Sequence, residues 1–245
     1  MAIGMRMRPL AVKSLPEGYT KCEHLESTGT QYIDTGVELT NNHSVELTSQ
    51  MTMTDVISCA VFGTQAEGNQ QGYAFSLYQS KNSENLCWFF YKTTSTAIYA
   101  NSFPEINVYD KMQIGVDGGL LRINGQNIKR GASGEFSTGK TCWIFDRNSY
   151  TDPTAFYGKI FNFKISRNGL VLNLQPTLDP TGVPCMFDFV TKKPFYNENT
   201  SSSDFLYKAY SYPFNPSDNW HTVNKKIKEI IGSTKYTLEL VEDGN

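Results

Sequence analysis

Four aromatic residues are the side chains of this sequence that best suit a recognition chemistry. Sugar recognition needs exposed aromatic faces beside amide and carboxylate groups. Asn101 and Gln113 add polar edges in the same part of the chain, although the sequence does not fix their direction. The alternative is that the aromatic rings belong to the hydrophobic core, as most aromatic residues of strands do. The candidates for a carbohydrate-binding groove on a concave sheet are Tyr73, Trp88, Tyr91 and Trp143.

Catalytic motifs are missing from the sequence. There is no Gly-x-Ser-x-Gly nucleophile elbow, no phosphate-binding glycine loop and no His-Glu-x-x-His motif, and His24, His43 and His221 are scattered. Sandwich-fold glycoside hydrolases need two carboxylates that flank the cleaved bond, and no Glu-x-Asp-x-x-Glu pattern supplies them. We therefore expect a protein that is not an enzyme and holds no cofactor. Asp34 and Asp188 are interpreted as hydrogen-bonded structural carboxylates.

Calcium is the metal ion that the sequence leaves open. Asp146 and Asp152, with the carbonyl groups of the same loop, could gather the clustered oxygen ligands that a hard cation prefers. The spacing of the two carboxylates is not specific to calcium, so an ordinary polar loop is the alternative.

The cysteines predict neither a zinc site nor a disulfide framework. They are odd in number, widely spread and without a Cys-x-x-Cys pair, which favours buried free thiols. The five positions are Cys22, Cys59, Cys87, Cys142 and Cys185.

Composition and charge argue against several classes of partner. The net charge is -2 and the pI is about 6.0, so no global basic field exists that would attract nucleic acid or an anionic membrane. No apolar run approaches the length of a membrane span, and the basic N-terminus lacks the apolar region of a secretory signal. We expect no nucleic-acid partner, no membrane association and no signal peptide. With reduced thiols, this indicates assembly inside a cell.

Short runs in which apolar and polar residues alternate fill most of the chain, as is typical of half-buried strands. Asn124-Gly125 and Asn168-Gly169 are tight hairpin signals between such runs. Many short strands separated by turns predict an all-β sandwich or barrel. The expected strands cover about 44–53, 57–62, 73–77, 86–91, 112–116, 121–123, 141–145, 161–165, 170–174, 186–190 and 194–196.

The two ends of the chain differ from this pattern. Residues 1–14 are predicted to form an N-terminal arm in which Arg6 and Arg8 alternate with apolar residues, either as a docking arm or as an ordinary extension. Residues 210–245 are predicted to form a small appendage with a helix over 217–231 and a strand over 234–241. The apolar stripe of this helix must pack on the sandwich, on a partner or on a symmetry mate. The candidate assembly contacts are Arg6, Arg8, Trp220, Val223, Ile227 and Ile230.

Two long phrases, and a short one between them, carry a resemblance to a known family. The first runs from Leu15 through Ser27-Thr28-Gly29-Thr30-Gln31-Tyr32-Ile33-Asp34-Thr35-Gly36. A middle phrase is Val61-Phe62-Gly63, and the closing phrase runs from the Asn168-Gly169 hairpin through Cys185-Met186-Phe187-Asp188-Phe189-Val190 to Phe195-Tyr196-Asn197. Together they resemble a concanavalin A-like, laminin-G-like jelly-roll module of bacteriophage and prophage structural proteins, especially those of gut bacteria. The likeness covers roughly residues 15–207, and departs from the family at 199–205, where members often carry a Gly-Thr-Gly-x-Phe phrase.

The resemblance implies a two-sheet jelly-roll domain over residues 15–209, flanked by the arm and the appendage. It also implies a non-enzymatic virion structural protein that decorates a capsid, forms a head fibre or belongs to a tail. Its partners would be other virion proteins and further copies of itself, and it would be assembled in the host cytoplasm. The family has no catalytic residue set to transfer. The alternative function is a lectin-like adhesin that binds host or mucus glycans.

Overall fold

The computed structural model describes residues 15–209, apart from 54–58, 68–70, 78–84 and 150–154. The segment Leu15–Ala209 forms one compact unit. The predicted arm (1–14) and appendage (210–245), with all six candidate assembly residues, lie outside the described residues. The domain boundaries therefore stay a prediction.

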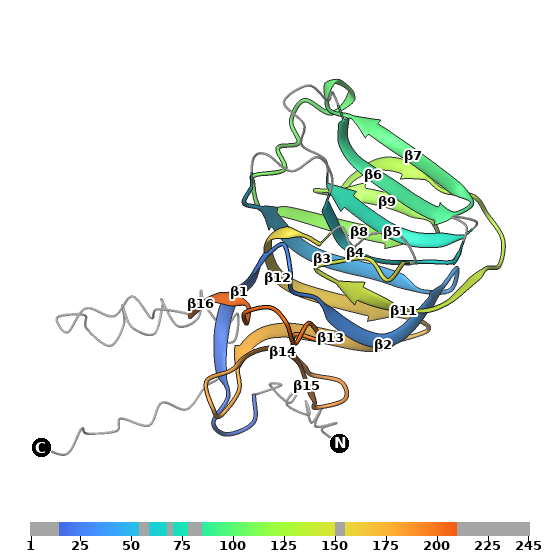
Figure 1. Ribbon diagram of the computed structural model, residues 1–245. Helices are drawn as coiled ribbons and strands as arrows, with labels where there is room; N and C mark the ends of the chain where they lie inside the picture. Colours follow the sequence, from blue (N-terminus) through green and yellow to red (C-terminus); the bar gives the residue numbers. More distant parts are fainter. Residues whose placement is uncertain (1–14, 54–58, 68–70, 78–84, 150–154, 210–245) are drawn as a thin grey trace, which may run out of the picture. The chain divides into compact units, whose positions relative to one another are not determined.

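The regular secondary structure of the described residues is almost entirely strand, which confirms the all-β prediction (Figure 1). A short 3-10 helix, η2 (Ala100–Ser102), follows β7. The strands are β1 (Thr20–Thr28), β2 (Ile33–Thr40), β3 (Ser44–Met51), β4 (Cys59–Gln65), β5 (Gly72–Leu77), β6 (Asn85–Lys92), β7 (Thr94–Tyr99), β8 (Met112–Asp117), β9 (Leu120–Ile123), β10 (Gln126–Arg130), β11 (Ser137–Ile144), β12 (Tyr157–Ser166), β13 (Leu170–Leu178), β14 (Pro184–Asp188), β15 (Pro194–Phe195) and β16 (Leu206–Ala209).

Two antiparallel sheets pack face to face as a sandwich. The ten-stranded sheet has the order β10-β9-β8-β3-β12-β1-β13-β14-β15, with β16 paired to β1. The six-stranded sheet has the order β2-β11-β4-β5-β6-β7. Most of the large buried side chains fill the space between the two sheets, including Phe62, Phe75, Phe89 and Phe163.

Local turn chemistry sets several of the connections. Asn124 and Gly125 both have positive φ (51° and 83°), as a tight hairpin turn between β9 and β10 requires. Asn168 and Gly169 make the corresponding turn between β12 and β13. Both hairpin predictions are confirmed. Met53, the last residue of the strand expected over 44–53, lies beyond the end of β3 and is 40% exposed.

The five cysteines are free and buried, as predicted. Burial raises the pKa of Cys22 and Cys185 to about 11, so both remain protonated thiols at neutral pH.

Asp188 is the buried structural carboxylate that the sequence predicted. It has no exposed surface, and its oxygens accept hydrogen bonds from the backbone N–H groups of Asn173 (2.7 Å), Val190 (3.1 Å) and Thr191 (2.7 Å). The side chain thus joins the turn after β14 to β13, and these donors satisfy the hydrogen-bonding capacity of a buried carboxylate.

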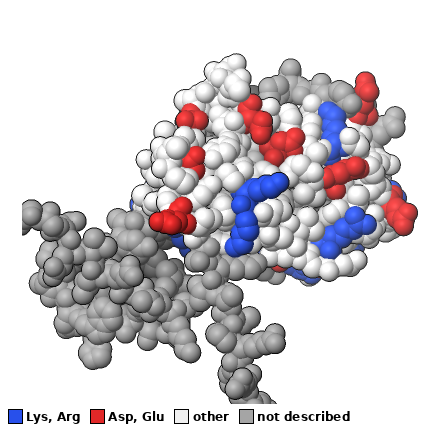
Figure 2. Space-filling model, turned by 90° about the horizontal axis from the view of Figure 1, so that it is seen from below, with Lys and Arg blue, Asp and Glu red and all other residues white. Residues whose placement is uncertain are grey.

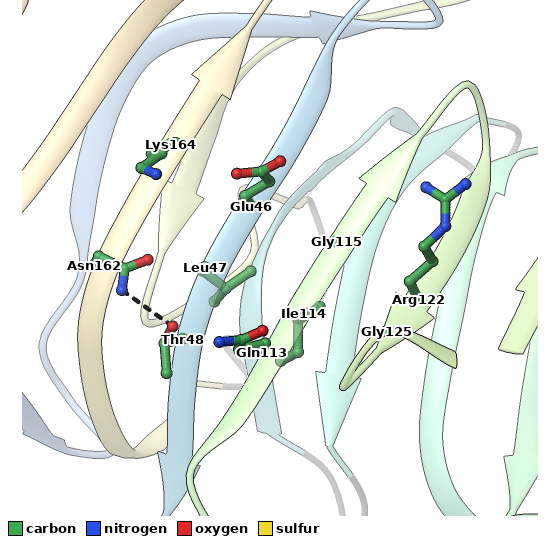
Figure 3. Close-up of a pocket in the computed structure, with 10 residues that line it drawn as sticks. All are labelled: Glu46, Leu47, Thr48, Gln113, Ile114, Gly115, Arg122, Gly125, Asn162 and Lys164. Atoms are coloured by element: carbon green, nitrogen blue, oxygen red, sulfur yellow. Dashed lines mark hydrogen bonds between the residues drawn. The ribbon is translucent and has the colours of Figure 1, made fainter. Parts of the chain in front are cut away.

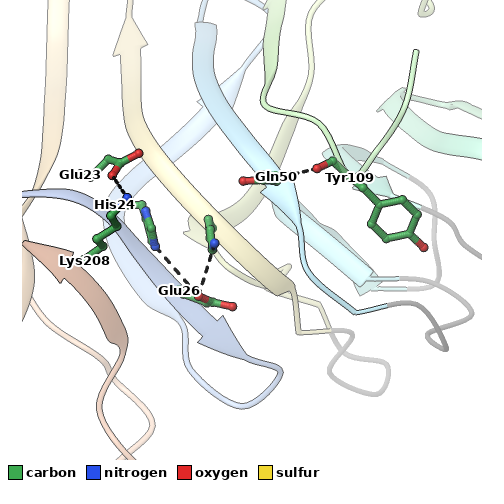
Figure 4. A network of polar contacts seen from close by, with 7 residues as sticks. Glu23, His24, Glu26, Gln50, Tyr109 and Lys208 are labelled. Carbon is green, nitrogen blue, oxygen red and sulfur yellow. Dashed lines mark hydrogen bonds and ion pairs between the residues drawn. The ribbon is translucent and has the colours of Figure 1, made fainter. Parts of the chain in front are cut away.

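A polar network covers the outer side of β1 (Figure 4). Glu23 makes an ion pair of 2.9 Å with Lys208 of β16. Glu26 lies 4.0 Å from both Lys159 of β12 and Nε2 of His24. His24 is 6% exposed, packs edge-on against Phe161, and its Nδ1 has no hydrogen-bond partner in the described part of the chain.

Stability is expected to fall as the pH drops from about 7 to 5, because His24 is held neutral. Burial, followed by the charge of Lys159, lowers the pKa of His24 below its ordinary value. The unfolded chain therefore binds more protons than the folded chain once the pH falls to about 6.5. Urea denaturation across this pH range measures the effect, and His24→Gln should show a shallower slope. Burial also lowers the pKa of His43, so part of the slope should persist in that variant. Equal slopes in the two proteins would contradict the role of His24.

None of the helices in the described part of the chain has the length and apolar character needed to cross a membrane. On the face seen in Figure 2, basic and acidic residues are interspersed among the other described residues.

Candidate binding site

Trp143 is the aromatic candidate that the fold places at a surface hollow. It lies on β11, opposite Asp34 of β2 on one side and Gly63 of β4 on the other. Its neighbours Cys142 and Ile144 point into the core, so the period-2 alternation of the strand turns Trp143 to the outer face of the six-stranded sheet. The side chain is half-buried.

Tyr32 stacks on Trp143. The ring centroids are 4.1 Å apart and the ring planes differ by 20°. Tyr32 precedes β2, where Ile33 enters the core, so Tyr32 and Asp34 both face outward. We call these two rings the Tyr32–Trp143 pair.

Two cavities border the Tyr32–Trp143 pair, and both residues line both of them. The first has a volume of about 390 Å³ and is completed by Asp34, Gly36, Pro194, Phe195, Tyr196 and Glu198. The second has a volume of about 450 Å³ and is completed by Gly29, Thr30, Asp146, Arg147, Ser149, Ala155 and Asn199. Each cavity has a size that a small ligand can occupy, and we call the two together the hollow beside the Tyr32–Trp143 pair.

Hydrogen-bonding groups surround the aromatic pair. Asp34 accepts hydrogen bonds from the backbone N–H of Gly36 and from the hydroxyl of Thr141, both at 2.8 Å. It is hydrogen-bonded, as predicted, but it is half-buried and lines the first cavity. Burial raises the pKa of Tyr32, with smaller contributions from the charges of Glu198 and Asp34. The phenol therefore stays a neutral donor at physiological pH.

The rim of the hollow is built where the beginning and the end of the domain meet. Tyr32 donates its N–H to Oδ1 of Asn197 (3.3 Å), and its carbonyl accepts from the N–H of Glu198 (2.9 Å). Asn199 donates from Nδ2 to the carbonyl of Thr30 (2.7 Å).

Gln31 fixes the same junction from inside. It is fully buried, and its Nε2 donates to the carbonyl of Ser203 at 3.1 Å. Its Oε1 accepts from Oγ of Ser27 (3.0 Å) and from the backbone N–H of Thr28 (2.9 Å). The residues of the opening phrase are therefore used to hold the two ends of the domain together.

The structure separates the four aromatic candidates into two pairs. Tyr73 and Tyr91 are buried in the core, with 0% and 2% of their surface exposed, and their ring centroids lie 5.0 Å apart. Neither offers a ring face to a ligand, so the expectation that they line a glycan groove was wrong. The reason is register, because their strands turn Tyr73 and Tyr91 toward the opposite sheet.

Trp88 shares the outer face with Trp143 but contributes to neither cavity. It is half-buried on β6, its Nε1 donates to Oγ of Ser95 (3.0 Å), and the guanidinium carbon of Arg147 lies 5.4 Å from the centre of its ring. Arg147 also lines the second cavity, so this side chain connects Trp88 to the hollow.

The amides expected at the edges lie elsewhere. Asn101 is exposed in η2, and Gln113 is on β8 of the ten-stranded sheet. Tyr32 was not among the sequence candidates. The alternation around Ile33 could have shown that Tyr32 faces outward. Its stacking on Trp143, however, depends on a pairing between segments that are distant in the chain.

The predicted calcium ligands remain untested as a pair. Asp146 is buried, and one carboxylate oxygen accepts a hydrogen bond of 2.6 Å from the N–H of Arg147. Asp152 lies outside the described residues. Within the described residues, no group of three or more His, Cys, Asp or Glu side chains could hold a metal ion.

Comparison of the chain with models of known protein families found no match, and comparison with curated protein sequences found none either.

Proposed function

We propose that this protein is a non-enzymatic structural protein of a bacteriophage virion, built on a concanavalin A-like, laminin-G-like jelly roll. In this proposal it decorates a capsid, forms a head fibre or belongs to a tail, and its terminal segments make the assembly contacts. The virion proteins around it and further copies of the chain are its partners.

One observation supports this proposal most: residues of the opening and closing phrases, on which the resemblance depends, make hydrogen bonds that hold the domain together. The side chains of Gln31 and Asn197 make hydrogen bonds that connect the beginning of the domain to its end, together with bonds to nearby residues. Asp188, in the closing phrase, accepts a hydrogen bond that stabilises the turn after β14. The residues that carry the resemblance therefore stabilise the fold, as we expect of a protein whose role is structural.

The test is mass spectrometry and cryo-electron microscopy of purified particles from the source. The proposal expects this chain at symmetric positions on the particle surface, and its absence from intact particles would overturn the proposal. Light scattering after size exclusion adds a second measurement, because a stable monomer at high concentration would argue against self-assembly.

A second candidate function is glycan binding at the Tyr32–Trp143 pair. The specific observation in its favour is an aromatic pair bordered by two cavities and by Asp34, Glu198 and Asn199. Aromatic rings cover the apolar face of a sugar, while carboxylates and amides bond to its hydroxyl groups. Such a surface on a virion would attach the particle to host or mucus glycans.

Trp143→Ala is expected to weaken glycan binding by about tenfold or more while the domain stays folded. The ring is half-buried and lies outside the core, so its loss removes a binding surface without opening a large internal cavity. A glycan array, followed by calorimetry with the best ligand, measures the effect. Tyr99→Ala is the matched control, because Tyr99 is an aromatic residue that is 51% exposed on the edge strand β7. Equal binding by the two variants would remove the Tyr32–Trp143 pair from consideration.

A further inference from the structure

A second hollow lies on the outer face of the ten-stranded sheet, away from the Tyr32–Trp143 pair (Figure 3). Its volume is about 390 Å³, and it is formed by β3, β8, β9 and β12. We call it the β3–β8 groove. Leu47 and Ile114, the apolar residues that border it, are each 2% exposed and belong to the core. Its accessible lining is therefore polar, which selects a hydrophilic ligand over an apolar one.

Strand register arranges the lining of the β3–β8 groove in two rows. Lys164, Glu46, Gly115 and Arg122 are consecutive partners across β12, β3, β8 and β9. Asn162, Thr48 and Gln113 form the next row. Directly paired residues project from the same face, so each row is continuous. Three strand spacings of about 4.8 Å make the first row roughly 14 Å long, which suits a short oligosaccharide.

Gly115 leaves the floor of the groove open. A Cβ atom at this position would meet no atom within 4 Å, and Gly115 is not among the glycines with positive φ. Neither packing nor backbone conformation therefore requires glycine. Glycine weakens the interior of a strand, and it often marks a place where a ligand approaches the backbone. What this glycine provides is the space between Glu46 and Arg122.

The charged groups of the first row are available for a ligand. Figure 3 shows the Glu46 carboxylate between the side chains of Lys164 and Arg122. Among the described residues, the ion pairs lie around Glu23 and Glu26 and include neither Glu46 nor Lys164. Arg122 donates from Nε to Asn127 at 3.0 Å, which orients the guanidinium and leaves its two terminal amino groups free of that bond. Asn162 donates from Nδ2 to Thr48 at 3.0 Å, which fixes the amide of the second row.

We propose that the β3–β8 groove binds an oligosaccharide that carries a carboxylate, of the uronic-acid or sialic-acid type. Arg122 binds the carboxylate, because a guanidinium matches it with two parallel hydrogen bonds, and Lys164 adds a second positive charge. Glu46 accepts hydrogen bonds from sugar hydroxyls, and Asn162 and Gln113 offer amide groups to others. The sugar ring lies over Gly115. This site is independent of the proposed Tyr32–Trp143 site, since the two lie on different sheets.

The test is titration calorimetry with sialyllactose and trigalacturonate, each beside its neutral counterpart, lactose or galactotriose. At least one acidic sugar should bind, about tenfold or more tightly than its neutral counterpart, and more weakly at high salt. Gly115→Thr should weaken this binding by about tenfold or more without lowering the thermal midpoint, since threonine favours strands and nothing obstructs its Cβ. Arg122→Gln should reduce the preference for the acidic sugar.

Two control variants separate this site from others. Lys129→Gln removes an exposed cation on β10 outside the groove, and Trp143→Ala removes the other proposed site, so both should retain binding of the acidic sugar. The proposal is overturned if neither acidic sugar binds, if neutral and acidic sugars bind equally, or if Gly115→Thr binds as the wild type does. Binding that is lost in Trp143→Ala and kept in Gly115→Thr would also overturn it, and would assign the sugar to the Tyr32–Trp143 pair.

Discussion

Gly63→Ala is expected to destabilise the sandwich by about 4 kcal/mol or more, enough to unfold a large share of the protein. Gly63 lies on β4 with a φ of 148°, a backbone conformation that side chains rarely tolerate. A Cβ atom there would lie 2.5 Å from Cα of Ala74 and 2.7 Å from the carbonyl oxygen of Tyr73. Both atoms belong to the backbone of the paired strand β5, so no side-chain rotation relieves the clash.

Urea denaturation of Gly63→Ala and Gly36→Ala measures this effect against a matched control. Gly36 also has a positive φ (67°), but a Cβ atom there would meet nothing within 4 Å. Gly36→Ala should therefore cost about 1–2 kcal/mol of backbone strain alone. Equal stability of the two variants would contradict the predicted clash between a Cβ atom at position 63 and the backbone of β5.

Tyr73→Ala is expected to cost about 3–5 kcal/mol of stability, as the loss of a large core aromatic residue does. The ring has no exposed surface and contacts Tyr91, Phe62 and Phe136 at centroid distances of 5.0, 6.3 and 6.3 Å. Its hydroxyl lies 3.0 Å from the carbonyl of His43 and 3.2 Å from that of Val116.

Tyr73→Phe separates the contribution of the hydroxyl from that of the ring. It keeps the ring and should cost about 1–2 kcal/mol, because buried carbonyl groups lose their donor. Thermal and urea denaturation measure both variants, and Tyr99→Ala, at an exposed position, should stay within about 0.5 kcal/mol of the wild type. A small effect of Tyr73→Ala, together with a loss of glycan binding, would return Tyr73 to the surface role that the sequence suggested.

The contrast between Tyr73 and Trp143 shows where sequence reasoning reached its limit. Both are aromatic residues in alternating strands, and the pattern of each strand gives two faces without saying which one meets the other sheet. In 86–91 the ambiguity is complete, because Phe89 and Tyr91 enter the core while Trp88 and Phe90 lie on the opposite face. Periodicity cannot choose between two apolar faces, since the choice depends on what covers each of them.

The candidate site could be predicted from the sequence only in part, for the same reason. Trp143 could be proposed from its type and its strand, whereas Tyr32 was quoted only within the opening phrase and was not proposed as a site residue. Their stacking depends on the pairing of β2 with β11, over more than a hundred positions of sequence. The β3–β8 groove depends likewise on the registers of four strands.

The sequence by itself determined the all-β class, the hairpins at Asn124-Gly125 and Asn168-Gly169, the buried thiols and the structural role of Asp188. These follow from local chemistry: the period of two in a strand, the positive φ that Asn and Gly accept, and the cost of burying a carboxylate without donors. The tertiary structure alone decided which aromatic faces are exposed, that Tyr32 meets Trp143, and that Gly115 opens a polar groove. Those features are set by strand register and by the packing of one sheet on the other, which join residues that no local pattern connects.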